Sequence, residues 1–299
     1  MRRKRETCEA ETAQNGRAGL ERSPDRSEAS RLASGEKPRN GARVKISAAA
    51  AFFDLDGTLM EEPSLERRFW KALHKSGEIP LGNYAAWIVE MVRQCRRGPR
   101  VAVQTNKRYL SGIASTCLAE TRMLKRSAAF ARTGGLRFLR EGVERAAWHV
   151  RRGETIVLVT GTLEPLAVRA AAALRNELRT RDCETAVHIC ATRLEETRGR
   201  WTGRVLGEAM FGEAKARAVR ALAGKFGLDL ARCSAYGDSK QDRWMLGCVG
   251  HAFAVNASAG LRRVARAHGW PVLEWAGEKA NHGRDKGMKA VRLCDGDAA

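Results

Sequence analysis

A short apolar run that ends in two closely spaced aspartates is the feature that most restricts the fold of this chain. Ser47–Phe53 reads SAAAAFF and is followed at once by Asp54-Leu55-Asp56-Gly57-Thr58. Such a run is typical of a buried strand, and parallel α/β sheets bind ligands at the carboxyl ends of their strands. The pattern therefore predicts a parallel sheet with two carboxylates at its functional edge.

The segments after residue 152 alternate short apolar runs with helical patterns, as α/β folds do. Thr155–Thr160 (TIVLVT) is apolar and β-branched throughout, which favours a central parallel strand. Further strands are predicted at Ala186–Cys190, Ser234–Tyr236 and Ala252–Val255, helices at Pro165–Leu178, Glu213–Phe226 and Ala259–Ala267, and a hairpin at Thr192–Leu206. The predicted fold class is α/β, with a Rossmann-like parallel sheet.

Residues 61–152 interrupt this alternation with patterns that are helical almost throughout. Helices are predicted at Ser64–Lys75, Tyr84–Arg97, Arg108–Lys125 and Gly142–Arg151. A long helical stretch between the first two strands predicts a separate cap inserted into the core, which would comprise residues 46–60 and 153–276. Gly57 and Gly153 would be hinges at the two crossings.

Both ends of the chain are predicted to lie outside the folded core. Residues 1–45 are basic and polar, with Leu20 and Leu32 nearly their only large apolar residues. Such a segment cannot bury enough surface to offset the entropy of ordering it, so we expect a disordered basic tail. The polar residues 277–299 are expected to form a flexible C-terminal tail.

Composition excludes several classes of protein. The eight cysteines form no CxxC pair, which argues against a zinc site and a disulfide framework. No run approaches the roughly 18 apolar residues of a membrane span, and no secretory signal is recognisable, so a cytoplasmic location is expected. The net charge of +20 comes without a nucleic-acid-binding motif. It is explained either by the codon bias of a GC-rich genome or by an acidic partner, and the oligomeric state is left open.

Three later segments add to the chemistry of the two aspartates. Thr160 and Gly161 end the second predicted strand, where a hydroxyl and helix N-terminal N–H groups can hold phosphate oxygens. Lys215 stands in the first turn of a helical pattern, which is unfavourable for a cation unless it serves an anion. Asp238 and Asp242 follow a later strand, four residues apart. Clustered carboxylates repel one another, and Mg²⁺ resolves such repulsion.

These four segments, in this order, resemble the four motifs of the haloacid dehalogenase-like (HAD) phosphatase superfamily. The helical insert is similar to the C1 cap of its subfamily IB, the phosphoserine-phosphatase-like branch. The resemblance extends from about Ser47 to Trp275 and leaves out both tails. It implies a hydrolase with a Rossmann-like core and a C1-type cap.

The resemblance also implies a role for each motif residue. Asp54 would be the nucleophile that becomes an aspartyl phosphate, and Asp56 the general acid and then the base. Thr160 and Gly161 would bind the phosphoryl oxygens, and Lys215 would neutralise Asp54 and the transferring group. The implied Mg²⁺ site consists of Asp54, the backbone carbonyl of Asp56, Asp238 and Asp242.

The expected activity is hydrolysis of a phosphate monoester of a small metabolite, with phosphoserine as the best single substrate. Asp56 favours phosphate esters over halides, because dehalogenating relatives lack an aspartate there. Glu61, Glu62 and cap arginines are candidates to recognise the substrate; the arginines are Arg93, Arg96, Arg97, Arg100 and Arg108. Another small or lipid-headgroup phosphate ester, a phosphotransferase, and a non-catalytic binding protein with a basic surface remain alternatives.

Overall fold

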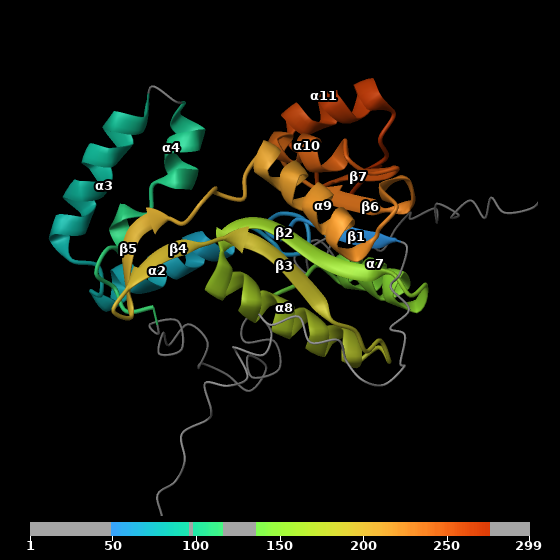
Figure 1. Ribbon diagram of the computed structural model, residues 1–299, viewed down its shortest axis with the longest axis horizontal. Helices are drawn as coiled ribbons and strands as arrows, with labels where there is room; N and C mark the ends of the chain where they lie inside the picture. The colour runs from blue at the N-terminus through green and yellow to red at the C-terminus, as the bar shows by residue number, and fades with distance from the viewer. Residues whose placement is uncertain (1–48, 96–97, 116–135, 276–299) are drawn as a thin grey trace, which may run out of the picture. The chain divides into compact units, whose positions relative to one another are not determined.

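The computed structural model describes residues 49–95, 98–115 and 136–275 (Figure 1). The predicted tails, 1–45 and 277–299, lie outside these ranges. No helix in the described ranges combines the length and the apolar content of a membrane span.

A six-stranded sheet forms the core, in the order β3-β2-β1-β6-β7-β8. Every neighbouring pair of strands in it is parallel, which confirms the predicted α/β fold class. The strands are β1 (Ala50–Phe53), β2 (Thr155–Leu163), β3 (Val187–Thr192), β6 (Ser234–Gly237), β7 (His251–Val255) and β8 (Val272–Leu273). Only the two-residue β8 was not predicted from the sequence.

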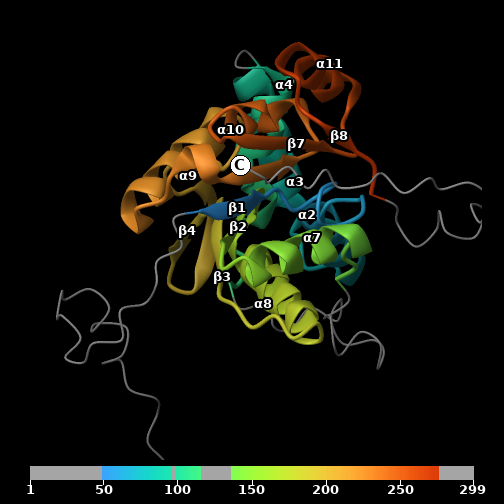
Figure 2. The same ribbon diagram turned by 90° about the vertical axis from the view of Figure 1, so that its right-hand side faces the viewer.

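Helices cover both faces of this sheet (Figure 2). On one face lie α7 (Arg140–Arg151) and α8 (Glu164–Arg179), and on the other α9 (Glu213–Phe226), α10 (Arg243–Leu246) and α11 (Ala259–His268). Successive strand residues point to opposite faces. Phe53 accordingly belongs to the buried cluster under α7 and α8, and Phe52 to the cluster under α9, α10 and α11.

Within residues 61–95 and 98–115, the described insert after β1 contains α2 (Leu65–Ser76), α3 (Leu81–Gln94), α4 (Pro99–Thr105) and the 3₁₀ turn η2 (Arg108–Leu110). A hairpin from the second half of the chain joins it: β4 (Leu194–Thr197) and β5 (Arg200–Val205) pair antiparallel, as predicted. Trp201 N donates to Ile113 O at 3.0 Å, and Gly112 N donates to Trp201 O at 2.7 Å. The buried Trp201 ring meets Phe69 of α2 edge to face. The described part of the insert is therefore helical, and it also packs against this hairpin.

The predicted helix at Arg108–Lys125 is wrong where the structure describes it. Only one 3₁₀ turn forms, because the backbone after it pairs with β5, as the isolated bridge between Ala114 and Arg200 shows. Residues 116–125 lie outside the described residues. The short α4 was not predicted, although Pro99 at its start is a common first helical residue.

Helix α7 belongs with the sheet by its contacts. Val143, Ala146 and Ala147 are buried in the same cluster as Phe53. Just before this helix, Leu139 N donates to Leu59 O at 2.8 Å. We therefore propose that the chain returns from the insert near residue 136, earlier than the predicted boundary at 152.

Candidate active site

The candidate site is a cavity of about 890 Å³ at the carboxyl edge of the sheet. Its walls come from the loops after β1, β2 and β6, from the first turns of α9 and α11, and from the insert. The backbone N–H of Asp54 continues the strand pairing by donating to Tyr236 O at 2.9 Å. Asp54 is thereby fixed at the end of β1, and it is only 6% exposed.

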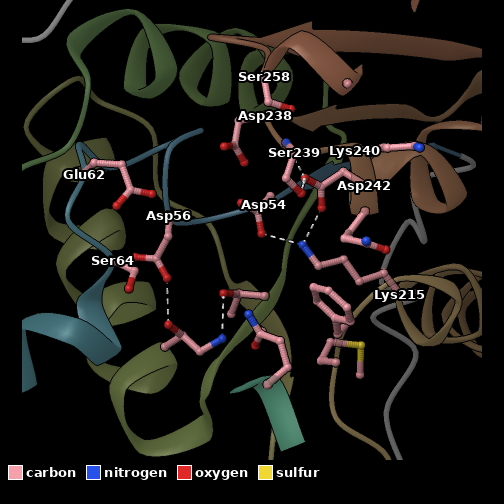
Figure 3. Close-up of a pocket in the computed structure, with 18 of the residues that line it drawn as sticks. Asp54, Asp56, Glu62, Ser64, Lys215, Asp238, Ser239, Lys240, Asp242 and Ser258 are labelled. Atoms are coloured by element: carbon pink, nitrogen blue, oxygen red, sulfur yellow. Dashed lines mark hydrogen bonds and ion pairs between the residues drawn. The ribbon is translucent and has the colours of Figure 1, made fainter. Parts of the chain in front are cut away.

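Lys215 joins two motifs that lie far apart in the sequence (Figure 3). Its Nζ donates to Asp54 Oδ1 at 2.5 Å and to Asp242 Oδ1 at 2.6 Å. The residue lies in the first turn of α9 and is buried. An ammonium group buried at this end of a helix is tolerated because it is paired twice.

Asp238 is the third carboxylate of the cluster. One carboxylate oxygen from each of Asp54, Asp238 and Asp242 lies within 4.8 Å of the others. Gly57 permits this approach: its φ is +87°, and a Cβ there would come within 2.6 Å of Asp238 Oδ2. Gly237 similarly leaves room for Asp242, whose Cβ would lie 2.5 Å from an added one. The glycines of both motifs are therefore required by close packing of the carboxylates.

The cluster contains three carboxyl groups and one ammonium group. Burial, the largest influence, raises the pKa of Asp54 to about 7 against the opposing effect of the Lys215 ammonium. Burial, followed by the charges of Asp54 and Asp242, raises the pKa of Asp238 to about 9. Burial alone would lower the pKa of Lys215, but the carboxylates of Asp242 and Asp54 raise it above its ordinary value. Three carboxylates around one ammonium leave room for a further cation.

Asp242 has both carboxylate oxygens occupied. Oδ1 accepts from Lys215, while Oδ2 accepts from Ser239 N at 2.9 Å and from Ser239 Oγ at 2.7 Å. This arrangement is a capping box at the start of the 3₁₀ turn η5 (Lys240–Asp242). Asp242 is thus rigidly placed to orient Lys215, and its part in a metal site remains a prediction.

The carboxylate of Asp56 makes different contacts. Its Oδ1 accepts from Leu65 N and its Oδ2 from Thr162 Oγ1, each at 2.7 Å. Figure 3 shows Asp54 between Asp56 and Asp242. Burial raises the pKa of Asp56, and the two hydrogen bonds lower it in part. The Asp56 side chain therefore stays outside the three-carboxylate cluster.

Thr160 and Gly161 line the cavity as predicted. Thr160 is 1% exposed, and its Oγ1 accepts from Thr162 N at 3.1 Å. Thr192 Oγ1 donates a hydrogen bond to the Gly161 carbonyl oxygen at 2.8 Å. Sequence reasoning missed Thr162 as a partner of Asp56, although it belongs to the same Thr-Gly-Thr segment.

The insert contributes acidic and polar residues to the cavity. Glu62, Ser64, Glu66 and Gln104 line it, and of the predicted Glu61 and Glu62 only the latter does. Glu66 is neutralised by an ion pair with the buried Lys107, and it also accepts from Tyr109 OH at 2.8 Å. Glu62 is therefore the acidic group that this wall offers to a ligand.

The predicted cap arginines do not reach the cavity where they are described. Arg93 is exposed and pairs with Glu90 at 3.7 Å. Arg108, the first residue of η2, is also absent from the lining. Arg96, Arg97 and the side chain of Arg100 lie outside the described residues. Besides Lys215, the cations lining the cavity in the described ranges are Lys240 and Arg263, both on the core side.

A model of one protein family matches residues 51–247, and its description is haloacid dehalogenase-like hydrolase. The chain belongs to this family. The match includes all four motif segments, and the parallel sheet with Asp54 at the end of β1 agrees with it.

Curated relatives support the phosphatase class within the HAD family. Phosphoserine phosphatase SerB1 of Mycobacterium tuberculosis is 39% identical over 127 residues, which is 42% of this chain and 38% of that protein. Probable phosphatase Rv3661 of the same organism is 30% identical over 241 residues, covering 79% of this chain and 78% of that protein. The chain thus matches less than half the length of SerB1 and most of the length of Rv3661.

A solved structure of a protein of unknown function from Bordetella pertussis Tohama I supports the fold. It is 27% identical, with a TM-score of 0.59, and the superposition covers 75% of this chain and 97% of that one. The likeness therefore extends over most of this chain.

Proposed function

We propose that this HAD hydrolase is a Mg²⁺-dependent phosphomonoesterase that forms an aspartyl phosphate on Asp54. The observation that carries the proposal is the position of the Lys215 ammonium, within 2.6 Å of oxygens of both Asp54 and Asp242. Phosphoryl transfer needs a positioned nucleophile and neutralisation of the charge on the phosphoryl oxygens. The buried cluster supplies both.

The residues present fit a magnesium ion. Asp54 and Asp238 offer hard oxygen atoms, and their raised pKa values reflect burial with too little positive charge nearby. We propose that these two carboxylates and the Asp56 carbonyl bind Mg²⁺, with Asp242 supporting the site through Lys215. A bound Mg²⁺ supplies further neutralisation of the phosphoryl oxygens.

The chain's own residues account for two successive displacements. Asp54 attacks the phosphorus of the ester, and the bond from phosphorus to the leaving oxygen breaks while Asp56 gives that oxygen its proton. Asp56 then takes a proton from water, whose oxygen attacks the phosphorus and releases Asp54 and inorganic phosphate. Thr160, Gly161 and Lys215 hold the phosphoryl oxygens in both steps.

The cavity favours a small substrate with both a cationic and an anionic group. Glu62 on the insert suits an ammonium group, and Lys240 and Arg263 on the core side suit a carboxylate. Phosphoserine carries both, and it remains the best single candidate. Recognition by cap arginines is not needed for it.

One observation favours a second candidate, a phosphate ester with a lipid tail. Val103 of α4 lines the cavity and is also 52% exposed, which places an apolar side chain where the cavity wall meets the surface. Transfer to an acceptor other than water and a purely binding function have no comparable observation in their favour. A cytoplasmic location remains a prediction.

Release of inorganic phosphate from a panel of small phosphorylated metabolites tests the proposal. We expect hydrolysis that EDTA removes and Mg²⁺ restores, with Ca²⁺ a poor substitute because it accepts looser geometry. The control is Asp54→Asn, which should fold but not turn over. Full activity in excess EDTA, or near-wild-type hydrolysis of p-nitrophenyl phosphate by Asp54→Asn, would contradict the mechanism.

A further inference from the structure

Helix α3 exposes an apolar face that the described part of the chain leaves uncovered. Its members are Leu81, Ala85, Ile88, Val89 and Val92, which recur at helical spacing. Leu81 is 86%, Ile88 56%, Val89 60% and Val92 68% exposed. Single exposed apolar residues are ordinary, but a stripe of them on one helix marks an interaction site.

The opposite side of α3 already serves to hold the helix in place. Tyr84 and Trp87 pack against the main buried cluster. Asn83 Nδ2 donates to Tyr109 O at 3.1 Å and to Ser111 O at 2.7 Å. These contacts fix the orientation of α3, so its apolar face points away from the buried cluster.

Helix α4 carries further exposed apolar side chains towards the cavity. It is joined to α3 by hydrogen bonds from Thr105 Oγ1 to Gln94 Oε1 at 2.5 Å and from Asn106 Nδ2 to the Trp87 carbonyl at 2.8 Å. Val103 of α4 is exposed and lines the cavity. Helix α4 thus connects α3 to the wall of the candidate active site, and the two helices lie side by side in Figure 1.

The neighbouring helix α2 has a basic outer face. Arg67, Lys71 and Lys75 recur every four residues and are exposed, and within the described ranges none of them forms an ion pair. A hydrogen bond of 2.6 Å between His74 Nδ1 and Tyr84 OH joins α2 to α3. The whole chain carries a net charge of +20. The insert therefore combines an apolar helix face with an excess of positive charge.

We propose that the α3 apolar face docks on an anionic lipid bilayer, with the helix lying in the interface and not crossing it. Helices bind membranes in this way by burying an apolar face, and basic residues are attracted to anionic lipids. A second copy fits less well, because two chains that each carry a net charge of +20 repel. The proposal holds whichever ester is hydrolysed.

Co-sedimentation of the full chain with vesicles tests the proposal. Vesicles of phosphatidylcholine alone are compared with vesicles that also contain phosphatidylglycerol, at low and high salt. We expect binding to the anionic vesicles that weakens in high salt. The double variant Ile88→Gln/Val92→Gln should lower the partition coefficient about tenfold. Val168→Gln/Leu206→Gln, a change at two scattered exposed sites, should not.

Several outcomes would overturn the proposal. One is wild-type protein that stays in the supernatant with anionic vesicles. Another is an Ile88→Gln/Val92→Gln variant that sediments like the wild type, since charge alone would then explain binding. Conversion of a dimer to a monomer by this variant, seen by light scattering, would assign the face to a second copy. Turnover of p-nitrophenyl phosphate and thermal melting of each variant check that it is folded. If the wild-type protein itself shows no phosphatase activity, that result contradicts the proposed function and not the membrane docking.

Discussion

Asp54 and Asp56 are two residues apart, yet their surroundings differ in a way that suits different chemical roles. Asp54 accepts a hydrogen bond from the Lys215 cation, which opposes the rise in its pKa that burial causes and so favours the charged form that a nucleophile needs. Asp56 is bound only by the neutral donors Leu65 N and Thr162 Oγ1, and burial raises its pKa. Burial thus makes Asp56 hold a proton more readily, as a general acid must, while its two hydrogen bonds oppose this effect.

The bond from Thr162 to Asp56 makes a testable prediction. Thr162→Val keeps the shape of the side chain but removes the donor at 2.7 Å from Asp56 Oδ2. If Asp56 protonates the leaving group, the loss should be about tenfold in kcat for alkyl phosphates. It should be smaller for p-nitrophenyl phosphate, whose leaving group needs little protonation. Thr202→Val, which removes a hydroxyl from β5, is the control. Equal losses on both substrates would mean a structural role only.

At the scale of elements, the loops after the strands determine which charged groups meet. The loop after β1 contains Gly57, and the loop after β6 contains Asp238 and Asp242. The two loops pack closely because Gly57 has no side chain at the point where the Asp238 carboxylate approaches it. The Mg²⁺ affinity we propose therefore depends on backbone packing as well as on the carboxylates themselves.

Gly57→Ala tests this dependence. A methyl group there would meet Asp238 Oδ2 at 2.6 Å, and alanine is also strained at a φ of +87°. We expect a higher Mg²⁺ concentration for half-maximal phosphatase activity. Gly153→Ala is a matched control, because its φ is +73° but no atom lies within 4 Å of the added methyl. It should lose about 1–2 kcal/mol of stability from strain and keep the Mg²⁺ dependence. The same Mg²⁺ dependence in both variants would refute the packing argument.

The contact between α7 and the sheet includes a buried histidine. His149 lies between Glu154 Oε2, at 2.6 Å from Nδ1, and Tyr236 OH, at 2.8 Å from Nε2. Burial lowers the pKa of His149; the bond to Glu154 opposes this effect, and Arg145 and Arg152 add to it. The neutral ring therefore donates from Nδ1 to Glu154 and accepts the Tyr236 hydroxyl proton at Nε2.

This histidine predicts a pH-dependent stability. The unfolded chain binds a proton at the ring near pH 6.5, while the folded chain does so only at lower pH. Stability is therefore complete above about pH 6.5 and falls as the pH drops below it. Urea unfolding at pH 7 and pH 5 should show this loss. His149→Gln should be less stable at pH 7, by about 1–3 kcal/mol, and less sensitive to pH. The exposed His268 is the control, and an unchanged pH slope in His149→Gln would refute the assignment.

At the scale of the whole molecule, the chain divides after Lys45. The part from Ile46 onwards holds every described strand and helix, and the candidate site draws on both the core and the insert within it. Residues 1–45 contain 12 Lys and Arg and 7 Asp and Glu, with few large apolar side chains. Their composition gives them little to contribute to the core.

Deletion of residues 1–45 should leave the melting temperature and the turnover of p-nitrophenyl phosphate nearly unchanged. The reason is their composition, because residues 1–45 have few large apolar side chains that could pack into a core. Thermal melting and steady-state kinetics of the truncated and full chains make the comparison. A large loss of either property would show that the segment contributes to the folded body.

Much of the core and of the site could be predicted from the sequence, because the signals are local. Strand and helix periods are written in neighbouring residues, and charged residues at strand ends point to the carboxyl edge of a parallel sheet. Hence Asp54, Lys215, Asp238 and Asp242 were expected to meet, and they do. Their catalytic and metal-binding roles stay proposals.

Contacts between segments that are distant in the sequence were decided by the tertiary structure alone, because the local pattern of one segment does not indicate which other segment it will meet. Thr162 reaches Asp56 across 106 positions of sequence, and β5 pairs with the chain after η2 in place of the predicted helix. The apolar residues of α3 would pass for a core face in the sequence, yet the packing of Tyr84 and Trp87 turns them to solvent. A hydrophobic period predicts that a helix has an apolar face, but only the surrounding elements determine what that face meets.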